Sequence, residues 1–204
     1  METKRLAGLE PAAVFHYFEE VCAIPHGSRN TKKISDYLVD FAKEHGLRYI
    51  QDGANNVILF GNGTCGMEAH APVILQGHMD MVCAQTEDCP KDMAREGLDL
   101  ATDGQYVWAE KTSLGGDDCI AVAAIFAILA DDSLPHPPLE AVITVDEETG
   151  MDPAKAGAFV GKVALKTSHK PLYTIGFAYK AAVLLTKILP ARALNWLIGK
   201  IYAS

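Results

Sequence analysis

Apolar and polar positions near the start of the chain alternate with the period of a helix. Residues 11–23 carry apolar side chains at a spacing close to 3.6, and Pro11 suits the first position of a helix. Residues 31–45 repeat the pattern, with Asn30 as a candidate cap and Gly46 as the expected end. The pattern therefore predicts two amphipathic helices.

Shorter apolar runs rich in β-branched residues predict strands. The first two are joined at Asp52-Gly53, and the acidic, loop-rich residues 87–111 allow a hairpin around Asp103-Gly104. The four predicted strands are residues 48–51, 56–60, 73–75 and 139–145.

Residues 118–130 are almost entirely apolar, which predicts a buried helix that opens at Asp117. Helices that alternate with apolar strands predict an α/β fold, with a mixed, largely parallel sheet flanked by helices. In such sheets, functional sites gather where strands end. The three segments that offer chemistry here all lie at the ends of predicted elements.

Composition narrows the class of protein. The chain has 204 residues, 49% of them hydrophobic, and a net charge of −8, which argues against a nucleic-acid partner. Its five cysteines are an odd number without CxxC spacing, and no apolar signal segment is visible at the start. We expect a reduced, cytoplasmic protein with free thiols.

The charge changes sign along the chain. Residues 1–150 hold 25 acidic and 10 basic side chains, whereas residues 151–204 hold one and eight. We therefore expect one domain at 1–153 and a basic, apolar tail at 154–204, either helical or poorly ordered. Basic residues and Pro190 interrupt the apolar run at 177–202, so we expect no membrane span there, and a basic amphipathic helix is the alternative.

His78 and Asp80 follow the strand at 73–75 and lie two residues apart. If the strand continues through them, both side chains leave the same face, where the imidazole could bind a metal and the carboxylate could steady it. The alternative is a hydrogen-bonded turn.

Asp117 and Asp118 follow two glycines and precede the apolar helix. Either could cap that helix. Because one acid suffices for capping, the second is free to face a site, where it could bridge two cations.

Asp146, Glu147 and Glu148 end the strand at 139–145. Three clustered anions are costly unless solvent or cations screen them, so the alternatives are a solvated turn and a metal site. Since neighbouring side chains point to opposite sides, one glutamate could bind a metal while the other acts as a base.

These motifs resemble a known family. Residues 73–82 (VILQGHMDMV), 112–118 (TSLGGDD) and 143–151 (ITVDEETGM) are similar to signatures of the M20 metallopeptidases, in particular the aminoacyl-histidine dipeptidases, or cytosol non-specific dipeptidases. The similarity extends from about residue 9 to residue 153, the N-terminal part of such a protein.

The resemblance implies a site with two Zn²⁺ ions, for which Mn²⁺ or Co²⁺ could substitute. His78 would bind one ion, Asp117 would bridge both, and Glu148 would bind the second. Asp80 would tune His78. Glu147 would be the general base that takes a proton from the metal-activated water and passes it to the leaving amine of a dipeptide such as Xaa-His.

The chain departs from the family after residue 153. The resemblance implies a later aspartate, a lid domain and a late histidine, but only His169 follows, and its surroundings are unlike those of the family. We therefore expect a catalytic domain without its lid and with an incomplete metal site. The alternatives are an inactive fragment with residual metal binding and association with membrane surfaces through the tail. The family allows homo-oligomers, for which this sequence offers no support.

Overall fold

The computed structural model describes residues 5–149. The chain divides into two compact units, Met1–Gly161 and Lys162–Ser204, and the described residues belong to the first. The expected tail at 154–204, with its candidate amphipathic helix, lies outside the described residues. Within residues 5–149, no helix is long and apolar enough to cross a membrane.

The three predicted helices are confirmed, as α1 (Ala12–Cys22), α2 (Lys32–Glu44) and α3 (Gly116–Leu129). The amphipathic α1 and α2 each bury one face, as their patterns predict. Helix α3 has no polar face, which fits its place between α1 and the strand that carries His78.

The expected cap of α2 is wrong. Thr31 occupies the N-cap position, and the amide of Asn30 instead donates to the carbonyl oxygen of Ala94, 2.9 Å away. An N-cap side chain accepts a backbone N–H of the first turn, whereas Asn30 lies one residue before the N-cap and its side-chain amide acts as a donor. Its partner, Ala94, lies in a loop that is distant in sequence.

The sheet has four strands in the order β1-β2-β6-β3, and a separate hairpin is formed by β4 and β5. The hairpin confirms the turn expected at Asp103-Gly104. The strands are β1 (Arg48–Gln51), β2 (Val57–Gly61), β3 (Val73–His78), β4 (Leu100–Thr102), β5 (Val107–Ala109) and β6 (Leu139–Thr144).

The expected mixed α/β sheet is confirmed, but the expectation that it is largely parallel is wrong: of its three strand pairs in residues 5–149, β3–β6 is parallel and the other two are antiparallel. Strands β1, β2 and β6 pair antiparallel in turn, whereas β3 runs parallel to β6. Strand β3 is also longer than the apolar run at 73–75, because its pairing with β6 continues until His78 lies opposite Thr144. The ends of two parallel strands thus bring His78 close to the acidic segment that follows β6.

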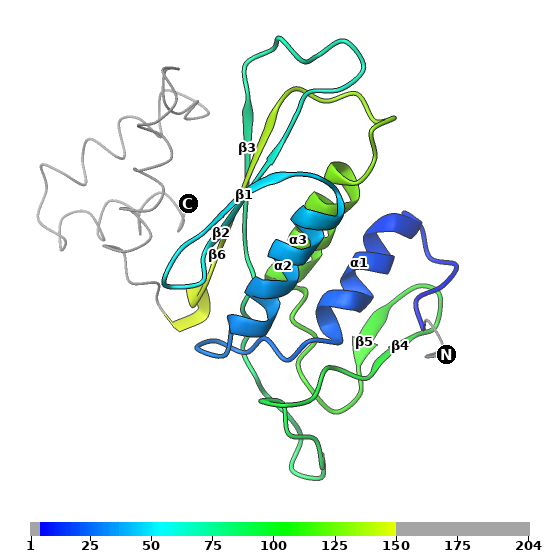
Figure 1. Ribbon diagram of the computed structural model, residues 1–204. Coiled ribbons are helices and arrows are strands. Elements are labelled where there is room, and N and C mark those ends of the chain that lie inside the picture. The colour runs from blue at the N-terminus through cyan, green and yellow to red at the C-terminus, as the bar shows by residue number, and fades with distance from the viewer. Residues whose placement is uncertain (1–4, 150–204) are drawn as a thin grey trace, which may run out of the picture. The chain divides into compact units, whose positions relative to one another are not determined.

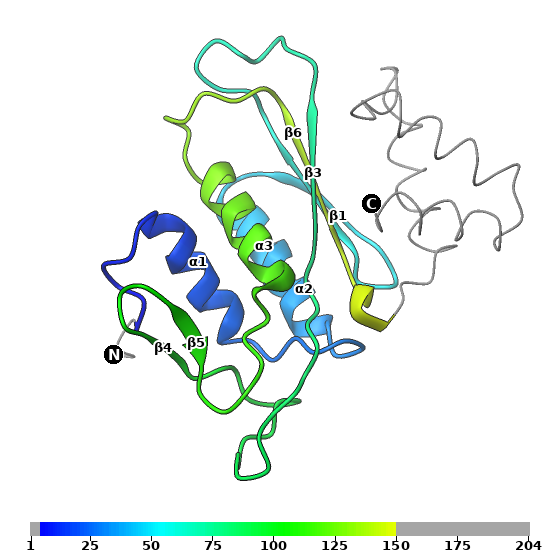
Figure 2. The ribbon, with the colours of Figure 1, turned by 180° about the vertical axis from the view of Figure 1, so that it is seen from behind.

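All three helices lie on the same side of the four-stranded sheet (Figures 1 and 2). Helix α2 contacts β1 and β2, α3 contacts β3, and α1 packs on α3. One aromatic cluster joins the helices: the rings of Phe41 and Phe126 stack with centroids 4.0 Å apart, and Tyr17 meets both edge-on. This core fixes α3, and therefore Asp117, against β3.

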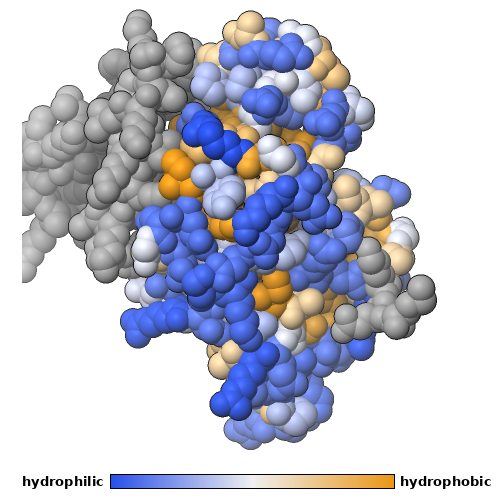
Figure 3. Space-filling model, in the orientation of Figure 1, coloured by the Kyte–Doolittle hydropathy of each residue, from blue (hydrophilic) through white to orange (hydrophobic). Residues whose placement is uncertain are grey.

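The face shown in Figure 3 is mainly hydrophilic, and its apolar areas are small and separated. Exposed apolar side chains such as Tyr106 (65% exposed) and Val82 (52%) come from different loops and strands. Single exposed apolar residues are normal on a folded protein. The coloured part of this face therefore shows no broad apolar surface.

Candidate active site

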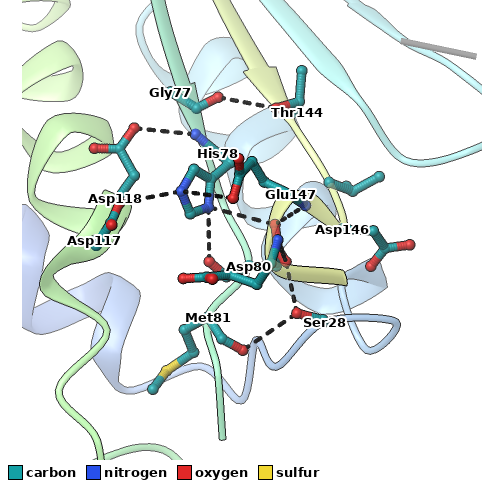
Figure 4. A network of polar contacts seen from close by, with 12 residues as sticks. Ser28, Gly77, His78, Asp80, Met81, Asp117, Asp118, Thr144, Asp146 and Glu147 are labelled. Carbon is teal, nitrogen blue, oxygen red and sulfur yellow. Dashed lines mark hydrogen bonds and ion pairs between the residues drawn. The ribbon is translucent and has the colours of Figure 1, made fainter. Parts of the chain in front are cut away.

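His78 ends β3 and is buried, with 6% of its surface exposed. Its Nδ1 lies 3.0 Å from the backbone oxygen of Asp80. Since a carbonyl oxygen only accepts hydrogen bonds, Nδ1 carries the proton and donates it. In the neutral ring this leaves the lone pair on Nε2, the atom that faces the other motifs (Figure 4).

Asp117 lies at the start of α3, and its Oδ1 is 3.3 Å from Nε2 of His78. Its side chain is 88% exposed, so the pair is open to solvent on the carboxylate side. The backbone of Asp117 and Asp118 is not helical, and the peptide bond between them is cis.

The capping interpretation of these aspartates is wrong. Gly115, in a left-handed conformation, occupies the N-cap position of α3. The Oδ2 of Asp118 instead accepts the backbone N–H of His78 at 3.3 Å. Both carboxylates therefore face the end of β3, one toward the imidazole and one toward the backbone.

The acidic segment after β6 forms a short 3-10 turn at Glu147–Thr149. The Oε2 of Glu147 lies 4.0 Å from Nε2 of His78, and its side chain is 44% exposed. Glu148 meets the site through its backbone N–H, which lies 3.3 Å from Oδ2 of Asp80, while its side chain is exposed. The turn thus directs Glu147, rather than Glu148, toward the imidazole.

Asp80 is fully buried and lies behind His78 as seen from Asp117 (Figure 4). Its carboxylate accepts the hydroxyl of Ser28 at 2.7 Å and the backbone N–H groups of Glu147 at 3.0 Å and Glu148 at 3.3 Å. Burial acts to raise the pKa of Asp80, but hydrogen bonds from these groups and His78 outweigh it and lower the pKa to about 2. Asp80 is therefore an anion at the centre of the network.

The anionic surroundings favour the protonated imidazole. The hydrogen bond with Asp80 raises the pKa of His78 to about 9, although burial opposes the shift. Burial also raises the pKa of Asp118. A cation placed among these groups would relieve the repulsion between their negative charges.

The structure thus brings His78, Asp80, Asp117 and Glu147 together, and leaves the side chain of Glu148 outside this cluster. No group of three or more His, Cys, Asp or Glu side chains within residues 5–149 is arranged to hold a metal ion. The separation of 3.3 Å between Nε2 of His78 and Oδ1 of Asp117 is compatible with two ligands of one metal ion. Two ligand atoms that each lie about 2.0–2.1 Å from a tetrahedral zinc are about 3.3 Å apart. The described residues therefore include two side chains that could hold a metal together.

Sequence reasoning gave Ser28 no role, although this loop serine lies within the stretch that the family resemblance covers. It also gave His26 no role. This ring is buried, and its Nε2 accepts a hydrogen bond from the thiol of Cys119, whose Sγ is 3.2 Å away. The Nδ1 of His26 lies 2.5 Å from the carbonyl oxygen of Ile24 and donates to it. Burial raises the pKa of Cys119 to about 12, so this cysteine is a structural thiol.

Comparison with known proteins gives the class first. The structure superposes on the aminoacylhistidine dipeptidase of Vibrio alginolyticus with a TM-score of 0.69 at 36% identity, over 72% of this chain and 30% of that one. A tripeptidase of Staphylococcus aureus matches with a TM-score of 0.56 at 25% identity, over 71% and 39%. The fold is therefore that of part of a peptidase catalytic domain.

The sequence gives the particular relative. The cytosol non-specific dipeptidase of Escherichia coli (strain K12) is 38% identical over 149 residues, which are 73% of this chain and 31% of that protein. No protein-family model matches the chain. The resemblance to the aminoacyl-histidine dipeptidases of the M20 family is confirmed for the N-terminal part of the chain. The chain spans about a third of the length of this relative (31%).

Proposed function

We propose that this chain carries part of the active site of a metal-dependent peptide hydrolase that cleaves short peptides such as Xaa-His dipeptides. The observation that carries the proposal is the separation of 3.3 Å between Nε2 of His78 and Oδ1 of Asp117, in a chain homologous to dipeptidases. The E. coli relative is named as a cytosolic protein, and we propose the same location here.

The metal ligands in this proposal are His78 and Asp117, with Zn²⁺ as the first choice and Mn²⁺ or Co²⁺ as alternatives. The Nδ1–H bond to the backbone of Asp80 makes Nε2 the nitrogen that loses its proton and binds the metal. When bound, zinc would polarise the scissile carbonyl and make a water molecule acidic. Glu148 remains the expected ligand of a second ion.

Glu147 is the proposed general base. Its carboxylate is partly exposed and lies beside Nε2 of His78, at the edge of the buried network. A carboxylate there can take a proton from a water molecule and return it to the leaving amine. Asp80 takes no part in this transfer: it holds the tautomer of His78 and the backbone of Glu147.

Catalytic zinc normally has three protein ligands and a water, and the described residues supply two. We propose that further ligands come from residues outside 5–149 or from another protein chain. The affinity of the isolated chain for metal is then lower than that of a complete site.

The test is hydrolysis of Ala-His and Gly-His by the purified 204-residue chain, with added Zn²⁺, Mn²⁺ or Co²⁺. The proposal expects metal-dependent turnover, and a fall of about 10²–10⁴-fold in the Glu147→Gln variant with metal binding retained. Lys43→Ala, an exposed change on α2, serves as the control and should leave turnover intact. Metal binding without turnover under any of these conditions would reject hydrolysis by this chain alone, and with it the proposal that the further ligands come from its own residues outside 5–149.

A further inference from the structure

The loop between α1 and α2, residues 25–30, is fastened to the segment that follows β3. The backbone N–H of Met81 donates to the carbonyl oxygen of His26, and the N–H of Ser28 donates to the carbonyl oxygen of Met81, both at 3.2 Å. This pair of bonds forms a short parallel bridge between Gly27 and Met81. The loop is therefore held directly beside Asp80.

The same loop reaches the other two motifs. The backbone N–H of Arg29 lies 2.5 Å from Oδ1 of Asp146, at the head of the acidic turn. The contact of His26 with Cys119 ties the loop to the first turn of α3. One loop that the motif analysis left without a role thus contacts all three segments of the site.

Ser28 makes the side-chain contact of this loop that lies nearest the chemistry. Its hydroxyl donates to Oδ2 of Asp80 at 2.7 Å, whereas the carbonyl oxygen of Met81, the other acceptor near it within residues 5–149, is 3.5 Å away (Figure 4). The other oxygen, Oδ1, accepts the N–H of Glu147 at 3.0 Å. The acidic turn thus contacts both oxygens, and Ser28 provides the shorter of the two bonds to Oδ2.

A fully buried carboxylate needs its oxygens satisfied, because an unpaired buried anion is costly. Without the hydroxyl, Oδ2 of Asp80 keeps only the longer bond from the N–H of Glu148, at 3.3 Å. The carboxylate could then rotate to regain a donor. Any such rotation changes its bonds to the backbone of both glutamates.

We propose that Ser28 is a positioning residue that acts through Asp80 to hold the Glu147–Glu148 turn against His78. The link is a chain of two hydrogen bonds, from the Ser28 hydroxyl to the carboxylate and from the carboxylate to the N–H of Glu147. Ser28 touches no reacting atom. Its consequence for catalysis rests on the proposed function, whereas its effect on the turn does not.

The first test is amide hydrogen exchange in the full-length, metal-free chain, read at Glu147 and Glu148 by NMR. Ser28→Ala should raise both exchange rates about fivefold, the factor that corresponds to loss of one hydrogen bond. Ser28→Thr keeps a hydroxyl and should restore the slow rates. Ser113→Ala is the matched control, because the Ser113 hydroxyl also bonds a loop carbonyl, that of Val82 at 2.6 Å.

The second test is a double-mutant cycle. If Ser28 acts through Asp80, then Ser28→Ala should have no further effect on these amides in an Asp80→Asn background. Additive effects of the two changes would overturn the proposal, as would unchanged amide exchange in Ser28→Ala alone.

Steady-state kinetics provide a separate test of the role of Ser28. In an active preparation, Ser28→Ala should lower kcat and leave KM unchanged, and Ser28→Thr should recover kcat, because the hydroxyl orients the base and does not bind substrate. A change confined to KM would contradict the positioning role. If the wild-type chain shows no turnover, hydrolysis by this chain alone is rejected, while the exchange measurements still decide the role of Ser28.

Discussion

Nε2 of His78 and Oδ1 of Asp117 lie 3.3 Å apart although 39 residues separate them in the chain. His78 is buried and held by its Nδ1–H bond, whereas Asp117 is largely exposed. A rigid nitrogen donor faces an accessible carboxylate, which leaves an approach for an ion from solvent. The first prediction tests this pair.

His78→Ala and Asp117→Ala should each weaken metal binding by at least about 100-fold, since loss of a direct ligand exceeds the 10–100-fold cost of removing an outer partner. Titration with Co²⁺, followed by visible absorption, measures the affinity. His70→Ala, at an exposed loop position, is the control and should bind Co²⁺ as the wild type does. Equal affinities in all four proteins would remove the pair from the metal site.

Gly77 is expected to tolerate no side chain. A Cβ atom there would lie 2.9 Å from Oδ2 of Asp118 and 3.7 Å from Cγ2 of Val122. Gly77→Ala should therefore displace the Asp118 carboxylate from the His78 N–H and cost about 1–3 kcal/mol of unfolding free energy. Urea unfolding measures the loss.

Gly53→Ala provides the comparison, because a Cβ at Gly53 would meet nothing within 4 Å. We expect its unfolding free energy to stay within about 0.5 kcal/mol of the wild type. If Gly77→Ala proves equally mild, Asp118 does not approach β3 this closely in solution.

The stability of the metal-free protein should depend on the charge of Asp80. Its pKa falls from an ordinary value of 3.8 to about 2 in the folded chain. A lowered pKa stabilises the fold above the unfolded-state value, and the benefit is lost as pH falls through about 2. The contribution is of order 2 kcal/mol.

Unfolding free energies of the wild type and Asp80→Asn, measured from pH 6 down to pH 2, check this prediction. The gap between the two proteins should be widest above pH 4 and should narrow as the solution becomes more acidic. Asp132→Asn, at an exposed position, should show a much smaller gap. If the difference in unfolding free energy instead widens toward low pH, the Asp80 carboxylate does not stabilise the fold in its charged form, and the prediction is wrong.

The reactivity of the cysteines toward an alkylating reagent should follow their exposure to solvent. All five are free thiols: Cys119 is buried, and its pKa is raised to about 12 by that burial, whereas Cys65 is exposed. Because the thiolate is the reactive form, iodoacetamide should modify Cys65 in the native protein and Cys119 only after unfolding. Peptide mass spectrometry distinguishes the two, and rapid native modification of Cys119 would refute its burial beside His26.

The sequence predicted those parts of the fold that local pattern controls. Periodicity located α1, α2 and α3 to within about two residues, the usual uncertainty at helix ends. It could not give the sheet order, because pairing of β2 with β6 depends on residues 78 to 86 positions apart. The same limit explains why β3 extends past its apolar core to His78.

In the site, too, some residues could be predicted from the sequence and others could not. Histidine and clustered acids beside glycine marked His78, Asp117 and Glu147, since these residue types carry the chemistry. Ser28 was missed, because a loop serine is ordinary until a buried carboxylate is found 2.7 Å from its hydroxyl. The contact of the Glu147 side chain with His78, and the backbone contact of Glu148 with Asp80, also depend on the turn geometry, which residue types alone do not fix.

The parallel register of β3 and β6, in which His78 lies opposite Thr144, limits where the length of this protein can vary. Deleting one residue from either strand would turn the following side chains to the other face and shift them by about 3.3 Å along the ladder. Insertions in the connections at residues 62–72 or 130–138, beyond the far ends of both strands, would leave that alignment untouched. Natural and engineered length variants should therefore be found in those two loops and be absent from the strand ends beside His78.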